Sequence, residues 1–146
     1  MADFATIADA IAARFLGMTP PTGQPTIKVA TADIPEGIGQ TPAFLVGMPD
    51  DEWQAAMHLR RGTLRFPCHL VIDQSDAART ARNLMAWRSL LYQRLDGQTQ
   101  LGGVAGVASA RVTSTSVGKL TLGDAEWQAI EVSVVVEIAE AHDAVA

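Results

Sequence analysis

The feature that most constrains the fold is the run EWQAIEVSVVVEIAE, which spans residues 126–140. Every even position within 130–138 is Ile or Val, whereas Glu131 and Glu137 lie at odd positions between them. Side chains of a β-strand point alternately to its two faces, so this pattern predicts one long strand with an apolar face and a polar face. The apolar face needs a covering layer, which the rest of the chain must supply.

Two segments have the spacing of amphipathic helices that could form this layer. Residues 3–16 repeat apolar side chains at helical intervals, with Asp3 as a candidate N-cap and Gly17 after the last apolar position. Residues 76–95 form the second predicted helix, which the pair Asp96-Gly97 would end. The apolar stripe of this second helix consists of Ala77, Ala81, Leu84, Trp87, Leu91 and Leu95.

The opposite side of the second helix is basic. Arg79 and Arg82 lie there, next to the apolar residues Ala86 and Leu90. Arg88 falls within the apolar stripe instead. Either its stem is buried and its guanidinium reaches water, or it forms a buried salt bridge with a carboxylate.

The remaining segments predict further strands. Short strands are expected at 27–31 and 43–48, with a Gly- and Pro-containing loop between them. A C-terminal hairpin is expected to join strand 107–117 to strand 127–139 through a connection containing GKLTLGD. These strands would pair with the long C-terminal one in a single sheet.

Residues 53–72 allow two interpretations. Apolar residues alternate on both sides of Arg61-Gly62, which predicts a β-hairpin with its turn at this pair. A short helix over DDEWQAAMHL, residues 50–59, is the alternative, so 51–60 is left open between strand and helix. The order of helix, strands, helix and two long strands predicts one α+β domain over residues 1–146. Its sheet is mainly antiparallel, and both helices pack on one face.

Composition excludes several classes of protein. The formal net charge of −5 disfavours nucleic-acid wrapping, which needs Lys and Arg to replace counterions. The single Cys68 cannot form an internal disulfide and fits a reducing compartment. No apolar run approaches the length of a membrane span and no signal peptide is evident. We therefore expect a soluble protein made in a cytoplasm, without contact with a membrane.

Charge is distributed unevenly along the chain. Residues 60–94 carry seven Arg against two acidic residues, a net of +5. Residues 1–59 have a net charge of −5, and residues 97–146 have a net charge of −4. These segments either form solvated faces or supply opposite patches that meet between subunits and determine which neighbour docks where.

Residues that could carry chemistry are few. His58, Cys68, His69 and Asp73 do not have zinc-ligand spacing, and adjacent strand residues such as Cys68 and His69 point to opposite faces. The Gly-rich segment 101–106 lacks the Lys-Ser/Thr pair of a phosphate loop. No nucleophile motif or pair of catalytic carboxylates is evident. We expect no metal site, no cofactor and no enzymatic activity.

The chain resembles the tail terminator family of long-tailed bacteriophages, also called tail completion or minor tail proteins. The likeness covers most of the chain and lies in length, element order and texture. It is carried by the helix FATIADAIAARF, the Pro/Gly-rich connector and the strand pair that ends in LRFPCHLVID. The helix DAARTARNLMAWRSLLYQRL and the C-terminal strand WQAIEVSVVVEIAE follow.

The resemblance implies a structural protein of the virion, at the phage neck. Such proteins form a ring, usually hexameric, that caps the tail tube, ends polymerisation of the tube protein and joins the tail to the head-connector or stopper protein. DNA would only pass through the lumen of the ring. Another neck or head-closure subunit is the alternative, and a small α+β ligand-binding domain or enzyme is a further one.

A ring contact between identical subunits needs two different complementary patches on each subunit. We expect Arg79 and Arg82, with Ala86 and Leu90 beside them, to form one patch. The polar face of the C-terminal strand, with Glu131 and Glu137, would form the other patch on the neighbouring subunit.

Overall fold

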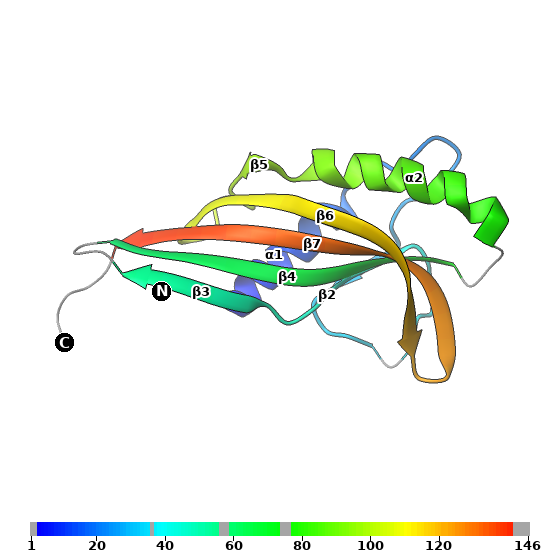
Figure 1. Ribbon diagram of the computed structural model, residues 1–146, viewed down its shortest axis with the longest axis horizontal. Coiled ribbons are helices and arrows are strands. Elements are labelled where there is room, and N and C mark those ends of the chain that lie inside the picture. Colours follow the sequence, from blue (N-terminus) through cyan, green and yellow to red (C-terminus); the bar gives the residue numbers. More distant parts are fainter. Residues whose placement is uncertain (1–2, 36, 56–58, 74–76, 142–146) are drawn as a thin grey trace.

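The structure is a computed structural model that describes residues 3–35, 37–55, 59–73 and 77–141. One sheet forms the centre of the molecule, and two helices lie along it; α1 is seen behind the sheet and α2 along its upper edge (Figure 1). The elements are α1 (Phe4–Leu16), β1 (Val29–Thr31), β2 (Ala43–Val46), β3 (Asp50–Ala55), β4 (Leu59–Asp73), α2 (Ala77–Arg94), β5 (Asp96–Thr99), β6 (Val107–Leu122) and β7 (Ala125–Ala141).

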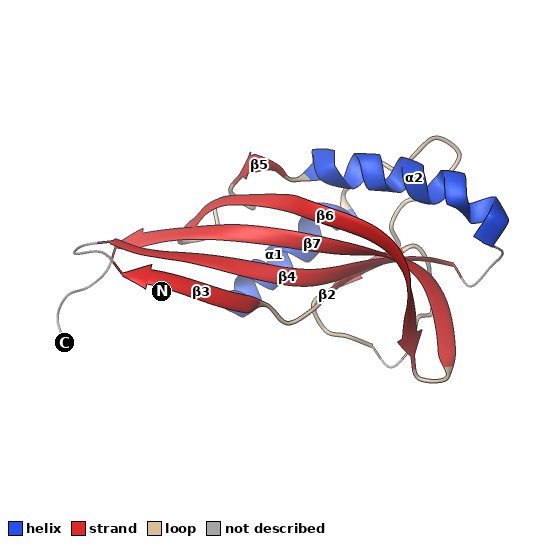
Figure 2. Ribbon diagram, in the orientation of Figure 1, coloured by secondary structure: helices blue, strands red, loops and turns tan. Residues whose placement is uncertain are grey.

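Within the described residues, the sheet has seven strands: six follow the order β1-β2-β4-β7-β6-β5, and β3 pairs with β4 outside this path. All pairs are antiparallel except β1 with β2. The long strands β4, β7 and β6 form its centre (Figure 2). Since β7 pairs along one edge of β4, β2 and β3 follow one another along the other edge. The predicted α+β fold with a mainly antiparallel sheet is confirmed.

Helix α1 covers the β1–β2 side of the sheet. Asp3 caps its first turn, because the backbone N–H of Ala5 donates to the Asp3 carboxylate at 3.1 Å. The Phe15 ring stacks on Phe44 of β2 with 4.1 Å between the ring centroids. The helix ends at Leu16, so the predicted boundaries at Asp3 and Gly17 are confirmed.

Helix α2 covers the β6–β7 side of the same face. Leu91 of α2 and Val134 of β7 are both fully buried and belong to one hydrophobic core. The C-terminal end of α2 is joined to that of α1, because Arg94 Nε donates to the backbone oxygen of Arg14 at 2.7 Å. The predicted stripe is buried at Leu84, Trp87, Leu91 and Leu95; the side chains of Ala77 and Ala81 lie outside the described part. Both helices therefore pack on one face of the sheet, as predicted.

The structure corrects the predicted turn at Arg61-Gly62. The hairpin exists, but both residues lie inside β4, where Gly62 pairs with Trp53 of β3. A Cβ atom on Gly62 would overlap the Trp53 ring, so this glycine makes room for an aromatic side chain and does not form a turn. Residues 56–58, which connect β3 to β4 in the sequence, lie outside the described residues. The helical alternative is wrong for 50–55, which is strand β3.

Two further boundaries differ from the predictions. Helix α2 ends at Arg94 and β5 begins at Asp96, so Gly97 is not a helix cap. The C-terminal hairpin is longer than predicted, because residues 118–122 continue β6 up to a two-residue turn. Gly123 in this turn has a φ of 60°, a conformation that glycine adopts without steric cost.

The face of the sheet without helices has a small apolar cluster of its own. Leu45, Val71 and Ala129 are buried there, with the partly buried Ile38 and Trp127 packed against them. The end of the β6–β7 hairpin, which carries Trp127, bends away from the plane of the other strands (Figure 1). Neither helix of the described residues is long and apolar enough to cross a membrane.

Candidate functional site

The outer surface of α2 is the predicted basic patch. Arg82 and Ala86 are exposed, whereas Leu90 is half-buried and packs against the core. Arg79 lies in α2, but its side chain is outside the described part. Met85 is 58% exposed and shares the outer surface with Arg82, from which it is three residues away. The apolar residue most accessible beside Arg82 is therefore Met85, which the sequence analysis did not select.

Arg88 joins α2 to the sheet. It is half-buried; its Nε donates to Thr115 Oγ1 at 2.9 Å and its Nη2 donates to the Thr115 backbone oxygen at 3.0 Å. The expected alternatives were a guanidinium in water or a salt bridge with a carboxylate. The guanidinium instead donates to a neutral hydroxyl and a backbone carbonyl of β6, which satisfy two of its five N–H donors.

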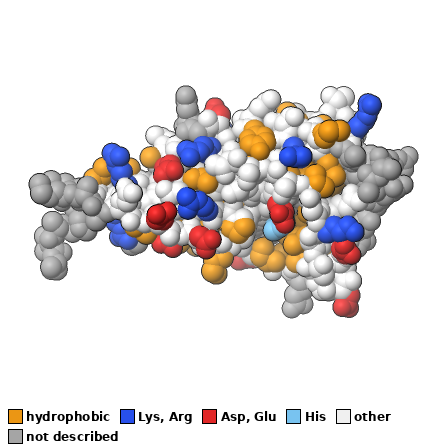
Figure 3. Space-filling view, in the orientation of Figure 1, with side chains coloured by type: hydrophobic (Ala, Val, Ile, Leu, Met, Phe, Trp, Pro, Cys, Tyr) orange, Lys and Arg blue, Asp and Glu red, His pale blue; other side chains and the backbone are white. Residues whose placement is uncertain are grey.

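The predicted acidic patch lies on the face of the sheet without helices. Glu131 and Glu137 of β7 both point to this face, but basic and acidic residues alternate around them (Figure 3). Arg111 Nη2 lies 3.9 Å from one Glu137 carboxylate oxygen, and Thr63 Oγ1 donates to the other at 3.0 Å. The charge of Glu137 is therefore partly satisfied within the chain, and the face has mixed charge.

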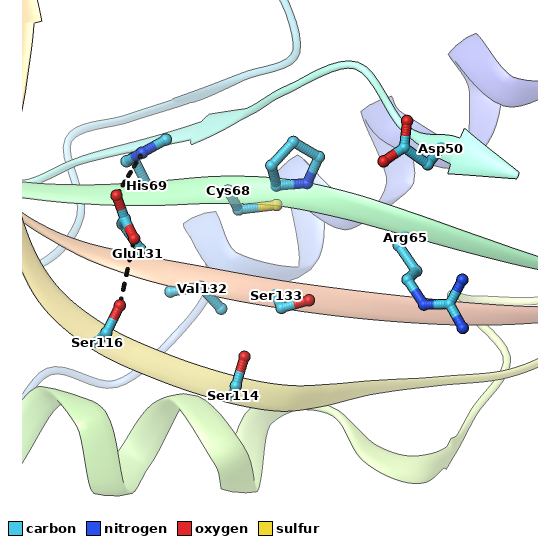
Figure 4. A pocket seen from close by; sticks show the side chains of 10 residues that line it. Asp50, Arg65, Cys68, His69, Ser114, Ser116, Glu131, Val132 and Ser133 are labelled. Carbon is cyan, nitrogen blue, oxygen red and sulfur yellow. Dashed lines mark hydrogen bonds and ion pairs between the residues drawn. The ribbon is translucent and has the colours of Figure 1, made fainter.

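A shallow hollow of about 420 Å³ crosses this same face. Glu131 stands between two partners: Ser116 Oγ donates to one carboxylate oxygen at 3.2 Å, and His69 Nε2 lies 3.9 Å from the other (Figure 4). Burial lowers the pKa of His69 below its usual value of 6.5, and the negative charge of Glu131 partly opposes this. A hydroxyl nucleophile needs the base beside it, but here the carboxylate separates His69 from Ser116.

Cys68 borders this hollow, but its side chain belongs to the main core under the helices. Its side chain is buried, and burial raises the pKa of its thiol to about 12, so it remains protonated at neutral pH. His69 is on the other face, as the strand alternation predicted. No three His, Cys, Asp or Glu side chains gather as metal ligands within the described residues; His58 lies outside them.

A second surface, which the sequence analysis did not identify, is a groove beside the N-terminal end of α1. It has a volume of about 660 Å³. Its apolar walls include Ile34 and Met48, which are 53% and 87% exposed. The groove is lined by three segments: Phe4, Ala5, Ala8 and Asp9 of α1, residues 32–34 after β1, and residues 46–49, which begin at the last residue of β2. No periodic pattern in the sequence links these segments.

The chain matches no known protein-family model and no curated protein. The candidate functional surfaces of the described residues are therefore the outer surface of α2, the groove beside α1 and the polar face of the sheet.

Proposed function

We propose that this chain is a structural protein of a phage neck that forms a closed ring, and that it acts as a tail terminator. In this role the ring caps the tail tube, ends its polymerisation and joins the tail to the head connector, with DNA passing through the lumen. The α+β architecture with helices on one side of long antiparallel strands supports the resemblance of the sequence to this family.

The separation of the charged surfaces carries this proposal. Arg82 lies on the outer surface of α2, which covers the β6–β7 side of the sheet. Acidic side chains line the groove beside α1, where Asp9 and Asp33 are accompanied by no Lys or Arg of the described residues, whereas Glu131 and Glu137 lie on a face of mixed charge. Surfaces of opposite charge on different sides of one subunit can meet between copies. Such a heterologous contact produces a ring when its rotation closes.

The polar hollow does not favour an enzyme. Its His69, Glu131 and Ser116 are ordered with the carboxylate in the middle, so the imidazole cannot take a proton from the serine. Arg65 and Asp50 also line the hollow, from neighbouring strands. Cross-strand pairs of this kind are ordinary stabilising contacts of a sheet surface.

The experiment that tests the proposal is electron microscopy of the purified protein over a range of concentrations, combined with analytical sedimentation. We expect closed rings of uniform size with a central opening, and we expect such rings on the ends of tail tubes when tube protein is present. A protein that remains monomeric or dimeric under all these conditions would contradict the proposal. Rings that bind a connector but no tube would favour another neck subunit.

A further inference from the structure

The groove beside α1 could accept an apolar side chain that has a basic residue next to it. Its walls expose Ile34 and Met48, and large exposed apolar groups that line one concave site mark a binding surface. Asp9 and Asp33 also line it, both exposed, whereas no Lys or Arg does. Neither carboxylate has a hydrogen-bond or ion-pair partner among the described residues.

The outer surface of α2 has the matching chemistry. Arg82 is exposed and has no partner among the described residues, and Met85 is 58% exposed one helical turn away. Methionine fits irregular apolar sites because its side chain is unbranched and flexible. Ala86 and Ser89 beside them are small, so a neighbouring surface could approach the helix closely.

We propose that the groove of one copy binds the outer surface of α2 of a second copy, with Met85 in the groove and Arg82 beside Asp9 and Asp33. This inference rests on the proposed ring and names its contact. The apolar insertion supplies affinity, whereas the charges at its rim determine orientation and the rate of association.

The position of the two surfaces fits a head-to-tail contact. The groove lies at the β2–β3 side of the sheet, where Phe4 of α1 stacks on Trp53 of β3 with 6.4 Å between centroids. The α2 surface lies over β6 and β7, on the other side of the central strands (Figure 1). Each copy thus presents a donor surface at one side and an acceptor at the other, as a heterologous ring requires.

The groove is a better acceptor than the carboxylates of β7. Glu131 and Glu137 each have a hydrogen-bond donor and a basic side chain beside them in their own subunit. An incoming arginine would compete with these groups, and would meet Arg65 and Arg111 on the same face. No such competition exists at Asp9 and Asp33 within the described residues.

Disulfide cross-linking tests the contact directly. The chain has one cysteine, the buried Cys68, so thiols introduced at the surface can be linked selectively. Mixing the single variants Ile34→Cys and Met85→Cys should give cross-linked pairs on mild oxidation, and one chain carrying both changes should give a ladder of multimers. The matched control mixes Met85→Cys with Arg61→Cys, because Arg61 is also exposed but lies on β4, away from the groove. Linking to position 61 as fast as to position 34, or no linking to position 34, would overturn the proposal.

Charge reversal distinguishes the two acidic surfaces. Arg82→Glu should lower the fraction of rings at low salt, and added salt should reduce the difference from the parent. Adding Asp33→Lys in the same chain should restore assembly, whereas adding Glu131→Lys should not. Arg61→Glu, with the same change of charge at an exposed arginine, should assemble like the parent. Rescue by Glu131→Lys alone would overturn the groove contact and leave the proposed ring intact.

Filling the groove gives an independent measurement. Ala5→Trp places a large ring in the groove from an exposed position of α1, so the fold should be retained, which circular dichroism checks. We expect the association constant to fall by roughly tenfold, as when one apolar anchor of an interface is lost. An unchanged association constant would overturn the groove contact. The absence of closed rings in the parent protein would instead contradict the proposed function, even if copies were linked as open chains.

Discussion

The two faces of the central sheet are built from alternate residues of the same strands, yet they depend on different interactions. On the face under the helices, Val134 of β7 is fully buried and packs in the main core. On the other face, Glu131 of the same strand is exposed and contacts Ser116 and His69 on the adjacent strands. Burial of apolar side chains contributes far more to stability than exposed ion pairs do.

The two faces of the sheet should therefore contribute unequally to the stability of the fold. Substitutions under the helices should change the free energy of unfolding. Substitutions on the face without helices should have small effects on it, apart from the local cluster around Val71 and Ala129. A surface that contributes little to stability can vary in its charges and still leave the fold intact.

The largest expected effect is that of Leu91→Ala in α2. Leu91 is fully buried against the sheet, so its truncation should lower the free energy of unfolding by about 2–5 kcal/mol in a urea titration. Met85→Ala on the outer surface of the same helix should cost less than about 0.5 kcal/mol. Similar losses for both variants would mean that the two sides of α2 are not distinguished by burial.

A smaller effect is expected for Gly62→Ala in β4. The new Cβ would overlap the Trp53 ring, which stacks with Phe4 and also contacts the Arg60 guanidinium, 4.3 Å from its centroid. We expect a loss of about 1–3 kcal/mol, the usual cost of overpacking. In a Trp53→Ala background the same change should cost much less. An equal cost in both backgrounds would exclude steric overlap as its cause.

Gly62 also illustrates what the sequence could and could not predict. The alternation in β7 and the apolar stripe of α2 correctly predicted that helices cover one face of the sheet. Burial of apolar side chains dominates the placement of long elements. Gly62 was predicted in a turn, because a glycine that permits a turn and one that makes room for a distant ring look the same in a sequence. The predicted position of this turn was therefore wrong because Gly62 makes room for the Trp53 ring.

The candidate site was less predictable than the fold. Arg82 and Ala86 were correctly placed on the outer surface of α2, because helical periodicity alone decides this. The groove was missed, because its three segments come together only in the tertiary structure. The partner of Arg88 was missed because a β-bulge between Val112 and Ser114 turns Thr115 toward the helices, which regular alternation does not anticipate.

Thr115→Val tests this bulge with a moderate effect. The substitution keeps the shape of the side chain but removes the hydroxyl that accepts from Arg88 Nε, while the bond to the backbone oxygen can remain. The loss in the free energy of unfolding should be about 0.5–1.5 kcal/mol. Thr113→Val is the matched control, since Thr113 is exposed at the bulge, and it should cost less than about 0.5 kcal/mol. A larger loss at Thr113 than at Thr115 would contradict the observed register.

The smallest expected effect concerns His69 on the face without helices. Burial lowers its pKa in the folded state below 6.5, so as the pH falls through 6.5 the unfolded chain takes up this proton first. The contribution of His69 to the free energy of unfolding is therefore present above pH 6.5. It is lost as the pH falls from 6.5 through the lower pKa of the folded state. Glu131 partly opposes the shift, because its charge favours the imidazolium 3.9 Å away.

Glu131→Gln removes that charge and should lower the pKa of His69 further, which an NMR titration of the His69 imidazole can measure. Glu137→Gln is the matched control on the same strand and face, since Glu137 contacts Thr63 and Arg111, and it should change the pKa of His69 much less. A higher pKa of His69 in Glu131→Gln would mean that Glu131 does not act on the imidazole by its charge. Equal shifts in both variants would mean that the whole face, rather than its nearest carboxylate, determines the protonation of His69.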